Sequence, residues 1–141
     1  MPKLKTEAMS SGIKILSDKA SAKDAAQFTE LFNEQCANGW NLLTYSYVTN
    51  LFGVRSAILA TFVEGDSTYE YRTELMHGKT KLIVSNKKQS DADNFNDELE
   101  EGCTDGWELV TYTYMTGLNV LSLLTFLSKG TLLATYRRRR A

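Results

Sequence analysis

The order of hydrophobic and polar residues divides the chain into two helix-like segments and several strand-like ones. Apolar side chains recur at i, i+3, i+7 and i+11 in residues 25–36 and again in residues 92–103. This spacing is typical of one face of an amphipathic helix. Residues 40–48 and 107–115, which follow these segments, are rich in Trp, Tyr, Thr and Val and are predicted as strands.

Shorter runs predict further strands on both sides of each helix. In the first half of the chain they are residues 13–16, 57–63 and 69–76, and in the second half residues 82–84, 120–127 and 132–138. Residues 1–12 show no such pattern and are predicted as a flexible N-terminal tail. Each half therefore has the order β-α-β-β-β.

The two halves match each other in sequence. Residues 38–51 align with residues 105–118 at an offset of 67 positions, and Trp40 then falls on Trp107. We predict an α+β protein of two tandem β-α-β-β-β repeats, residues 13–76 and 79–141, with antiparallel sheets. Because a unit of this size is marginal alone, the repeats are expected to form one compact domain about a pseudo-twofold axis. Whether they share one sheet or form two stays open.

The alternation along residues 40–48 predicts a sheet that is apolar on both faces. Trp40 and Leu42 fall on one face, and Leu43, Tyr45 and Tyr47 fall on the other. A helix covers only one face of a sheet. We therefore expect the second face to meet the other repeat, another chain or a ligand.

A tetrapeptide at the end of each predicted helix carries a family resemblance. It reads Gly106-Trp107-Glu108-Leu109 in the second half and Gly39-Trp40-Asn41-Leu42 in the first. This pattern resembles small bacterial and phage domains of unknown function that consist of a strand, a helix ending in GWEL and a hairpin. The resemblance implies a fold and no specific activity.

Composition and charge exclude several classes of function. The chain of 141 residues is 43% hydrophobic with a net charge of −1, which gives no general attraction to nucleic acid or to a membrane surface. The longest apolar stretch, residues 118–127, has about half of the roughly 20 residues that a membrane helix needs. The start of the chain lacks the apolar core of a signal peptide. We expect a cytoplasmic protein that does not bind membranes, and the basic run at residues 137–140 is interpreted as a solubilising end rather than a nucleic-acid site.

Candidate chemistry is sparse. Cys36 and Cys103 fall at equivalent positions of the two helices and are interpreted as core residues. His77 is the one histidine and lies in a predicted turn. The sequence holds no motif typical of a nucleophile, a phosphate loop or a metal site. We expect no enzyme activity, no cofactor and no metal.

The remaining candidates are repeated tyrosines with basic residues near them. The aromatic set is Tyr45, Tyr47, Tyr112 and Tyr114, and the basic set is Arg55, Arg72 and Lys81. One interpretation is that the tyrosines fill the core between the repeats or an interface with a protein partner or within a homo-oligomer, because rigid aromatic side chains are favoured in interfaces. The alternative is a pocket between the repeats in which tyrosines stack on a nucleotide-like molecule and basic residues bind its anionic groups. The sequence leaves both open.

Overall fold

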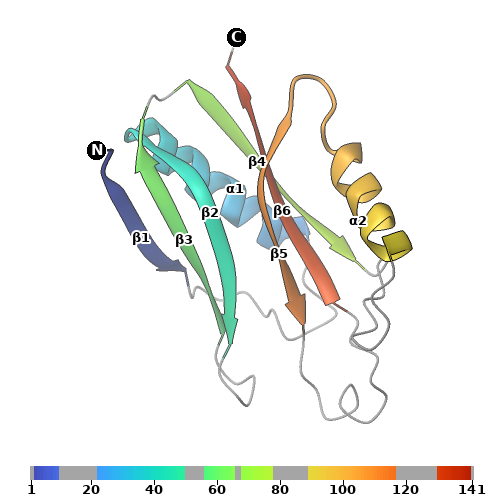
Figure 1. Cartoon of the computed structure of the whole chain (residues 1–141). Coiled ribbons are helices and arrows are strands. Elements are labelled where there is room, and N and C mark those ends of the chain that lie inside the picture. The colour runs from blue at the N-terminus through green and yellow to red at the C-terminus, as the bar shows by residue number, and fades with distance from the viewer. Residues whose placement is uncertain are drawn as a thin grey trace.

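The computed structural model describes residues 2–9, 22–49, 56–65, 68–77, 89–116 and 130–140, which form two helices and six strands (Figure 1). In chain order these are β1 (Leu4–Met9), α1 (Ala22–Ala37), β2 (Trp40–Thr49), β3 (Ser56–Glu64), β4 (Tyr69–His77), α2 (Gln89–Glu101), β5 (Glu108–Thr116) and β6 (Gly130–Arg139). The predicted strands at residues 13–16, 82–84 and 120–127 lie outside the described residues. Within the described residues, no helix is long and apolar enough to cross a membrane.

The strands form two antiparallel sheets of three strands each. Sheet A has the order β1-β3-β2, and sheet B has the order β4-β6-β5. The α+β class is therefore confirmed, and the question of one sheet or two is resolved as two. Strand β4 lies in sheet B, away from the other strands of the first half, so the sheets do not divide the chain at residues 76–79.

The prediction of a flexible N-terminal tail is wrong, because residues Leu4–Met9 form β1, which pairs with β3. The polar side chains of this segment hide its strand character. The ammonium group of Lys5 lies 4.7 Å from the centre of the Trp40 ring and 5.6 Å from that of Phe62. Lys5 thus occupies a core-facing position of β1, where its ammonium group lies over two aromatic rings.

A bulge in β2 changes the predicted faces of sheet A. The register with β3 shifts between Leu42 and Thr44, so that Leu42 shares a face with Tyr45 instead of opposing it. Strict alternation through this segment is therefore wrong, since one extra residue in a strand reverses the side-chain pattern beyond it. Strand β5 shifts in the same way between Leu109 and Thr111.

The larger core cluster lies between the sheets and around α1. It contains Phe28, Phe32 and Cys36 from α1, residues of the helix-covered face of sheet A, and Tyr71 and Leu133 from sheet B. A smaller cluster lies between α2 and the opposite face of sheet B. Helix α1 thus packs against both sheets, whereas α2 covers sheet B alone (Figure 1).

Candidate interaction surface

The four tyrosines predicted to form one site lie in different environments. Tyr45 is buried in the larger cluster, with its ring stacked 5.9 Å from that of Phe32. Its hydroxyl donates to the carbonyl oxygen of Leu133 at 3.0 Å and lies 3.0 Å from the hydroxyl of Thr135. Burial raises the pKa of Tyr45 well above its usual value, so this hydroxyl stays a neutral donor. Tyr45 therefore joins the two sheets.

Tyr47 lies near Tyr45 at the same interface, but its hydroxyl is buried without a hydrogen-bond partner. Its backbone N–H donates to the hydroxyl of Thr113 in β5 at 3.2 Å. Further along the same two strands, the hydroxyls of Thr44 in β2 and Thr111 in β5 lie 3.2 Å apart. Strands β2 and β5 therefore run side by side and meet through side chains.

Tyr112 lies on the other side of sheet B, where its ring meets Phe95 of α2 edge-on at 5.1 Å. It remains 46% exposed. Tyr114 belongs to β5, where it pairs with Leu132, and its side chain lies outside the described residues. The structure therefore does not bring Tyr45 and Tyr112 together, although the prediction grouped them.

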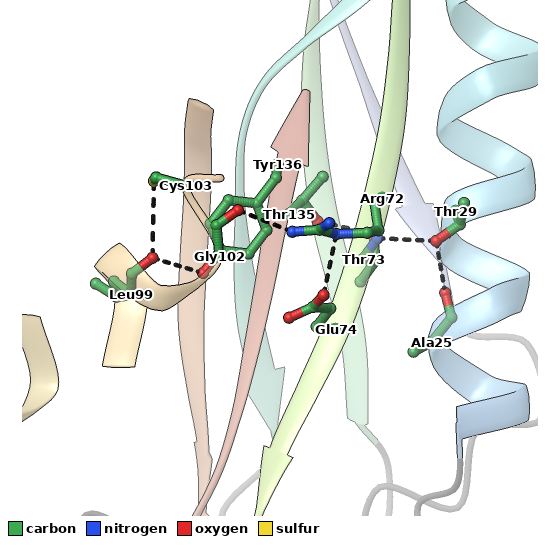
Figure 2. A network of polar contacts seen from close by, with 10 residues as sticks. All are labelled: Ala25, Thr29, Arg72, Thr73, Glu74, Leu99, Gly102, Cys103, Thr135 and Tyr136. Atoms are coloured by element: carbon green, nitrogen blue, oxygen red, sulfur yellow. Dashed lines mark hydrogen bonds and ion pairs between the residues drawn. The ribbon is translucent and has the colours of Figure 1, made fainter. Parts of the chain in front are cut away.

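Of the three basic candidates, the structure describes only Arg72, since Arg55 and Lys81 lie outside the described residues. The guanidinium of Arg72 lies 4.6 Å from the centre of the Trp107 ring and donates to the carbonyl oxygen of Gly102 at 2.9 Å (Figure 2). It also pairs with Glu74 at 3.0 Å. These contacts tie β4 to the segment after α2, and none of them involves Tyr45 or Tyr47.

Tyr136 completes this group of contacts. The side chain is buried, and its hydroxyl donates to the carbonyl oxygen of Leu99 at 2.9 Å. Burial, with the nearby carboxylate of Glu74 as a second cause, raises the pKa of Tyr136 to about 12. The ring leaves no room beside it, since a Cβ added at Gly102 would lie 2.2 Å from its Cζ atom. This packing fixes the end of α2 on sheet B.

The sequence did not indicate how α1 covers the free edge of β4. The amide of Asn33 accepts the N–H of Tyr71 at 2.8 Å and donates to the carbonyl oxygen of the same residue at 3.1 Å. Thr29 accepts the N–H of Thr73 at 2.8 Å (Figure 2), and the thiol of Cys36 donates to the carbonyl oxygen of Tyr69 at 3.4 Å. Side chains of α1 thus take the place of a neighbouring strand. The polar residues at positions 29 and 33, inside an apolar helix stripe, were the available signal.

One sheet face is left uncovered within the described residues, and we call it the outer face of sheet A. It lies opposite α1 and includes Leu4, Thr6, Leu43, Val48, Leu59 and Thr61. Four of these are large apolar side chains with high exposure, namely Leu4 at 62%, Leu43 at 50%, Val48 at 48% and Leu59 at 44%. The strand register places Thr6 beside Thr61, with their hydroxyls 3.0 Å apart. A sheet face that exposes several large apolar side chains is typical of an interaction site.

The two cysteines differ in exposure, and most of the basic end belongs to a strand. Cys36 is buried as predicted, but Cys103 is exposed, because α2 ends at Glu101 and Cys103 follows it. Among the described residues no three His, Cys, Asp or Glu side chains are grouped as a metal would need. The first three arginines of the basic end belong to β6, and two of them form ion pairs: Arg137 with Glu108 at 2.7 Å, and Arg138 with Glu70.

Comparisons with protein-family models, with curated proteins and with solved structures each found no match for this chain. The resemblance to bacterial and phage domains therefore stays a prediction.

Proposed function

We propose that this chain is a non-catalytic protein-interaction module that self-associates through the outer face of sheet A. The observation that carries the proposal is the position of Leu4, Leu43, Val48 and Leu59, which expose large apolar side chains on that face. Transfer of such surface from water into an interface is favourable by roughly 25 cal/mol for each Å² buried. The alternative, a nucleotide-like ligand between the repeats, loses support because Tyr45 and Tyr112 lie on different sides of sheet B.

We also propose that the chain is a duplication, but of a β-α-β-β unit. The first unit is β1-α1-β2-β3, and the second is β4-α2-β5-β6. In sequence, Lys5-Thr6-Glu7 matches Arg72-Thr73-Glu74 at the offset of 67 positions, and Ala60-Thr61 matches Ala134-Thr135. In this frame β4 begins the second unit, which accounts for its place in sheet B.

Contacts around the matching cations support this frame. Lys5 lies over Trp40 and pairs with Glu7 at 3.5 Å. Arg72 lies over Trp107 and pairs with Glu74 at 3.0 Å. The Trp residues also match at the offset of 67, so the same cation–aromatic–carboxylate group occurs in both units.

The strand registers support it as well. Thr6 lies opposite Thr61 in sheet A, and Thr73 lies opposite Thr135 in sheet B. The bulges in β2 and β5 fall at matching residues, directly before Thr44 and Thr111. These agreements are independent of the sequence match, because register comes from backbone pairing.

The test of the proposed function is the mass of the protein in solution. Wild-type protein is expected to give a light-scattering mass at least about twice the 15.8 kDa of one chain. Leu59→Lys places a charge in the outer face of sheet A and is expected to reduce this mass to that of one chain, since an unpaired charge is costly to bury. Gln27→Lys, on an exposed position of α1, is the matched control and should not change it. An unchanged mass for Leu59→Lys would contradict the proposal.

A further inference from the structure

The contact between the two proposed units uses different surfaces of each. The first unit contributes Thr29, Asn33, Cys36 and Tyr45, which we call the α1 side. The second contributes the face of sheet B opposite α2, including Tyr71, Thr73, Leu133 and Thr135, which we call the outer face of sheet B. The α1 side binds the backbone edge of β4 and the carbonyl oxygen of Leu133. The contact is therefore head-to-tail. A twofold axis between the units would instead make the contact reciprocal, with the same surface used on both.

A head-to-tail contact leaves one surface unused at each end of the chain. The equivalent of the α1 side is a surface of Asn96, Glu100, Cys103 and Tyr112, which we call the α2 side. The equivalent of the outer face of sheet B is the outer face of sheet A. All four residues of the α2 side are exposed, whereas Cys36 and Tyr45 on the α1 side are buried. Leu59 is likewise exposed, whereas its equivalent Leu133 is fully buried.

The unused surfaces carry several of the groups that the internal contact uses. Thr6 and Thr61 hold their hydroxyls 3.0 Å apart, as Thr73 and Thr135 do at 2.9 Å, and Tyr45 binds at that second pair. Tyr112 is the equivalent tyrosine and is available to bind at Thr61. Its partner groups are thus already arranged.

The edge of β1 offers the same backbone groups as the edge of β4. Among the described residues β1 pairs only with β3, which leaves its other edge open. On α1, Thr29 and Asn33 accept backbone N–H groups from β4. Their equivalents Asn96 and Glu100 also carry acceptor oxygens and lie exposed on α2. A free strand edge is a site where further backbone pairing or capping is favourable.

We infer that a second copy of this chain docks its α2 side on the outer face of sheet A, repeating between chains the contact that joins the units within one chain. The inference rests on the proposed function and names its partner and both surfaces. The contact is heterologous, so repeated use of it builds a ring or a filament.

Mixing two variants tests the inference, because each spoils one surface. Leu59→Lys alters the outer face of sheet A, and Tyr112→Lys alters the α2 side; each alone is expected to be monomeric. An equimolar mixture keeps one intact pair of surfaces and is expected to form a one-to-one complex of about twice the mass of one chain. The control mixes Leu59→Lys with a double variant that carries both Gln27→Lys and Tyr112→Lys. This mixture should give the same complex.

The outcomes separate the inference from the proposed function. If Leu59→Lys is monomeric while Tyr112→Lys still associates, and the mixture gives no complex, then the head-to-tail contact is wrong and self-association through the outer face of sheet A stands. A monomeric wild type overturns both. Circular dichroism and a thermal melt of each variant establish that it is folded.

A crosslink supplies a second measurement that needs no disruptive substitution. Cys36 donates to the carbonyl oxygen of Tyr69, and the equivalent pair is Cys103 with Pro2 of the next chain. Both of these residues are exposed. Pro2→Cys is therefore expected to form a disulfide with Cys103 of a second copy under mild oxidation, giving bands of twice the mass of one chain and of higher multiples on a non-reducing gel. A band that persists when Cys103→Ser is added, or no band at all, would count against the contact.

Discussion

At the scale of single residues, Tyr45 and Tyr47 form a natural pair for comparison. Both belong to β2 and lie at the interface of the two sheets. The hydroxyl of Tyr45 is bonded to Leu133 and lies beside Thr135, whereas that of Tyr47 is buried without a partner. The same chemical change at the two positions should therefore have different consequences.

We expect Tyr45→Phe to lower the free energy of unfolding by about 1–2 kcal/mol, because the carbonyl oxygen of Leu133 loses its donor in a buried setting. Tyr47→Phe is expected to be neutral or to raise it by up to about 1 kcal/mol, since it removes a buried polar group that has no partner. Urea denaturation of both variants measures the difference in the free energy of unfolding. The dependence of this free energy on urea concentration should be the same in both. Equal losses at the two positions would show that the hydroxyl of Tyr47 is bonded in solution.

At the scale of elements, the join between α1 and β4 determines how the sheets are held together. A strand edge normally pairs with another strand, but here Thr29, Asn33 and Cys36 of α1 supply the partners. These three side chains are four and three residues apart along the helix, and they bond to every second residue of β4. Every second residue of an edge strand points its backbone N–H and carbonyl groups away from the sheet.

We expect Asn33→Ala to lower the free energy of unfolding by about 2 kcal/mol, because it leaves both the N–H and the carbonyl oxygen of Tyr71 without partners. Hydrogen exchange adds a local measurement: the amide of Tyr71 should exchange faster than in wild type, while amides of β3 stay protected. Asn38→Ala, at an exposed position just beyond the same helix, is the control and should change the stability by less than about 0.5 kcal/mol. Unchanged exchange at Tyr71 would argue that another group binds this edge.

Element types could be predicted from the sequence far better than the way the elements combine. The helices and strands β2 to β6 follow from periodicity and residue type, and Gly39, just after α1, has a left-handed φ of 86°, as is common for glycine at the end of a helix. Strand β1 was missed because Lys5 occupies a core-facing position, which its contacts with the rings of Trp40 and Phe62 explain. The bulge before Thr44 depends on backbone register, which residue patterns do not contain.

The candidate site was predictable only in part for the same reason. The prediction treated the repeated tyrosines as one set, yet Tyr45 and Tyr112 have opposite exposure. Their sequence surroundings are nearly the same, so no local rule separates them. The difference comes from packing between units: sheet B covers Tyr45, and nothing in the described chain does the same for Tyr112. Sequence identity between repeats thus predicts equal conformation and does not predict equal surroundings.

At the scale of the whole molecule, the two proposed units depend on each other for folding. The larger core cluster draws Phe32 and Tyr45 from the first unit and Tyr71 and Leu133 from the second. Without the first unit, the outer face of sheet B would expose Tyr71 and Leu133 and the edge of β4 would lose its partners. A unit of this size already buries little surface for its length.

We therefore expect fragments 1–66 and 67–141 to lack a cooperative thermal transition when each is alone, and to regain native near-UV circular dichroism when mixed. The cut falls between β3 and β4, so it divides no described strand. Fragment 1–66 carrying Asn33→Ala should need a higher concentration to restore the signal, because it cannot bind both backbone groups of Tyr71. A cooperative melt of fragment 67–141 alone would contradict the prediction, since it would mean that sheet B and α2 are sufficient without the cover that α1 and Tyr45 provide.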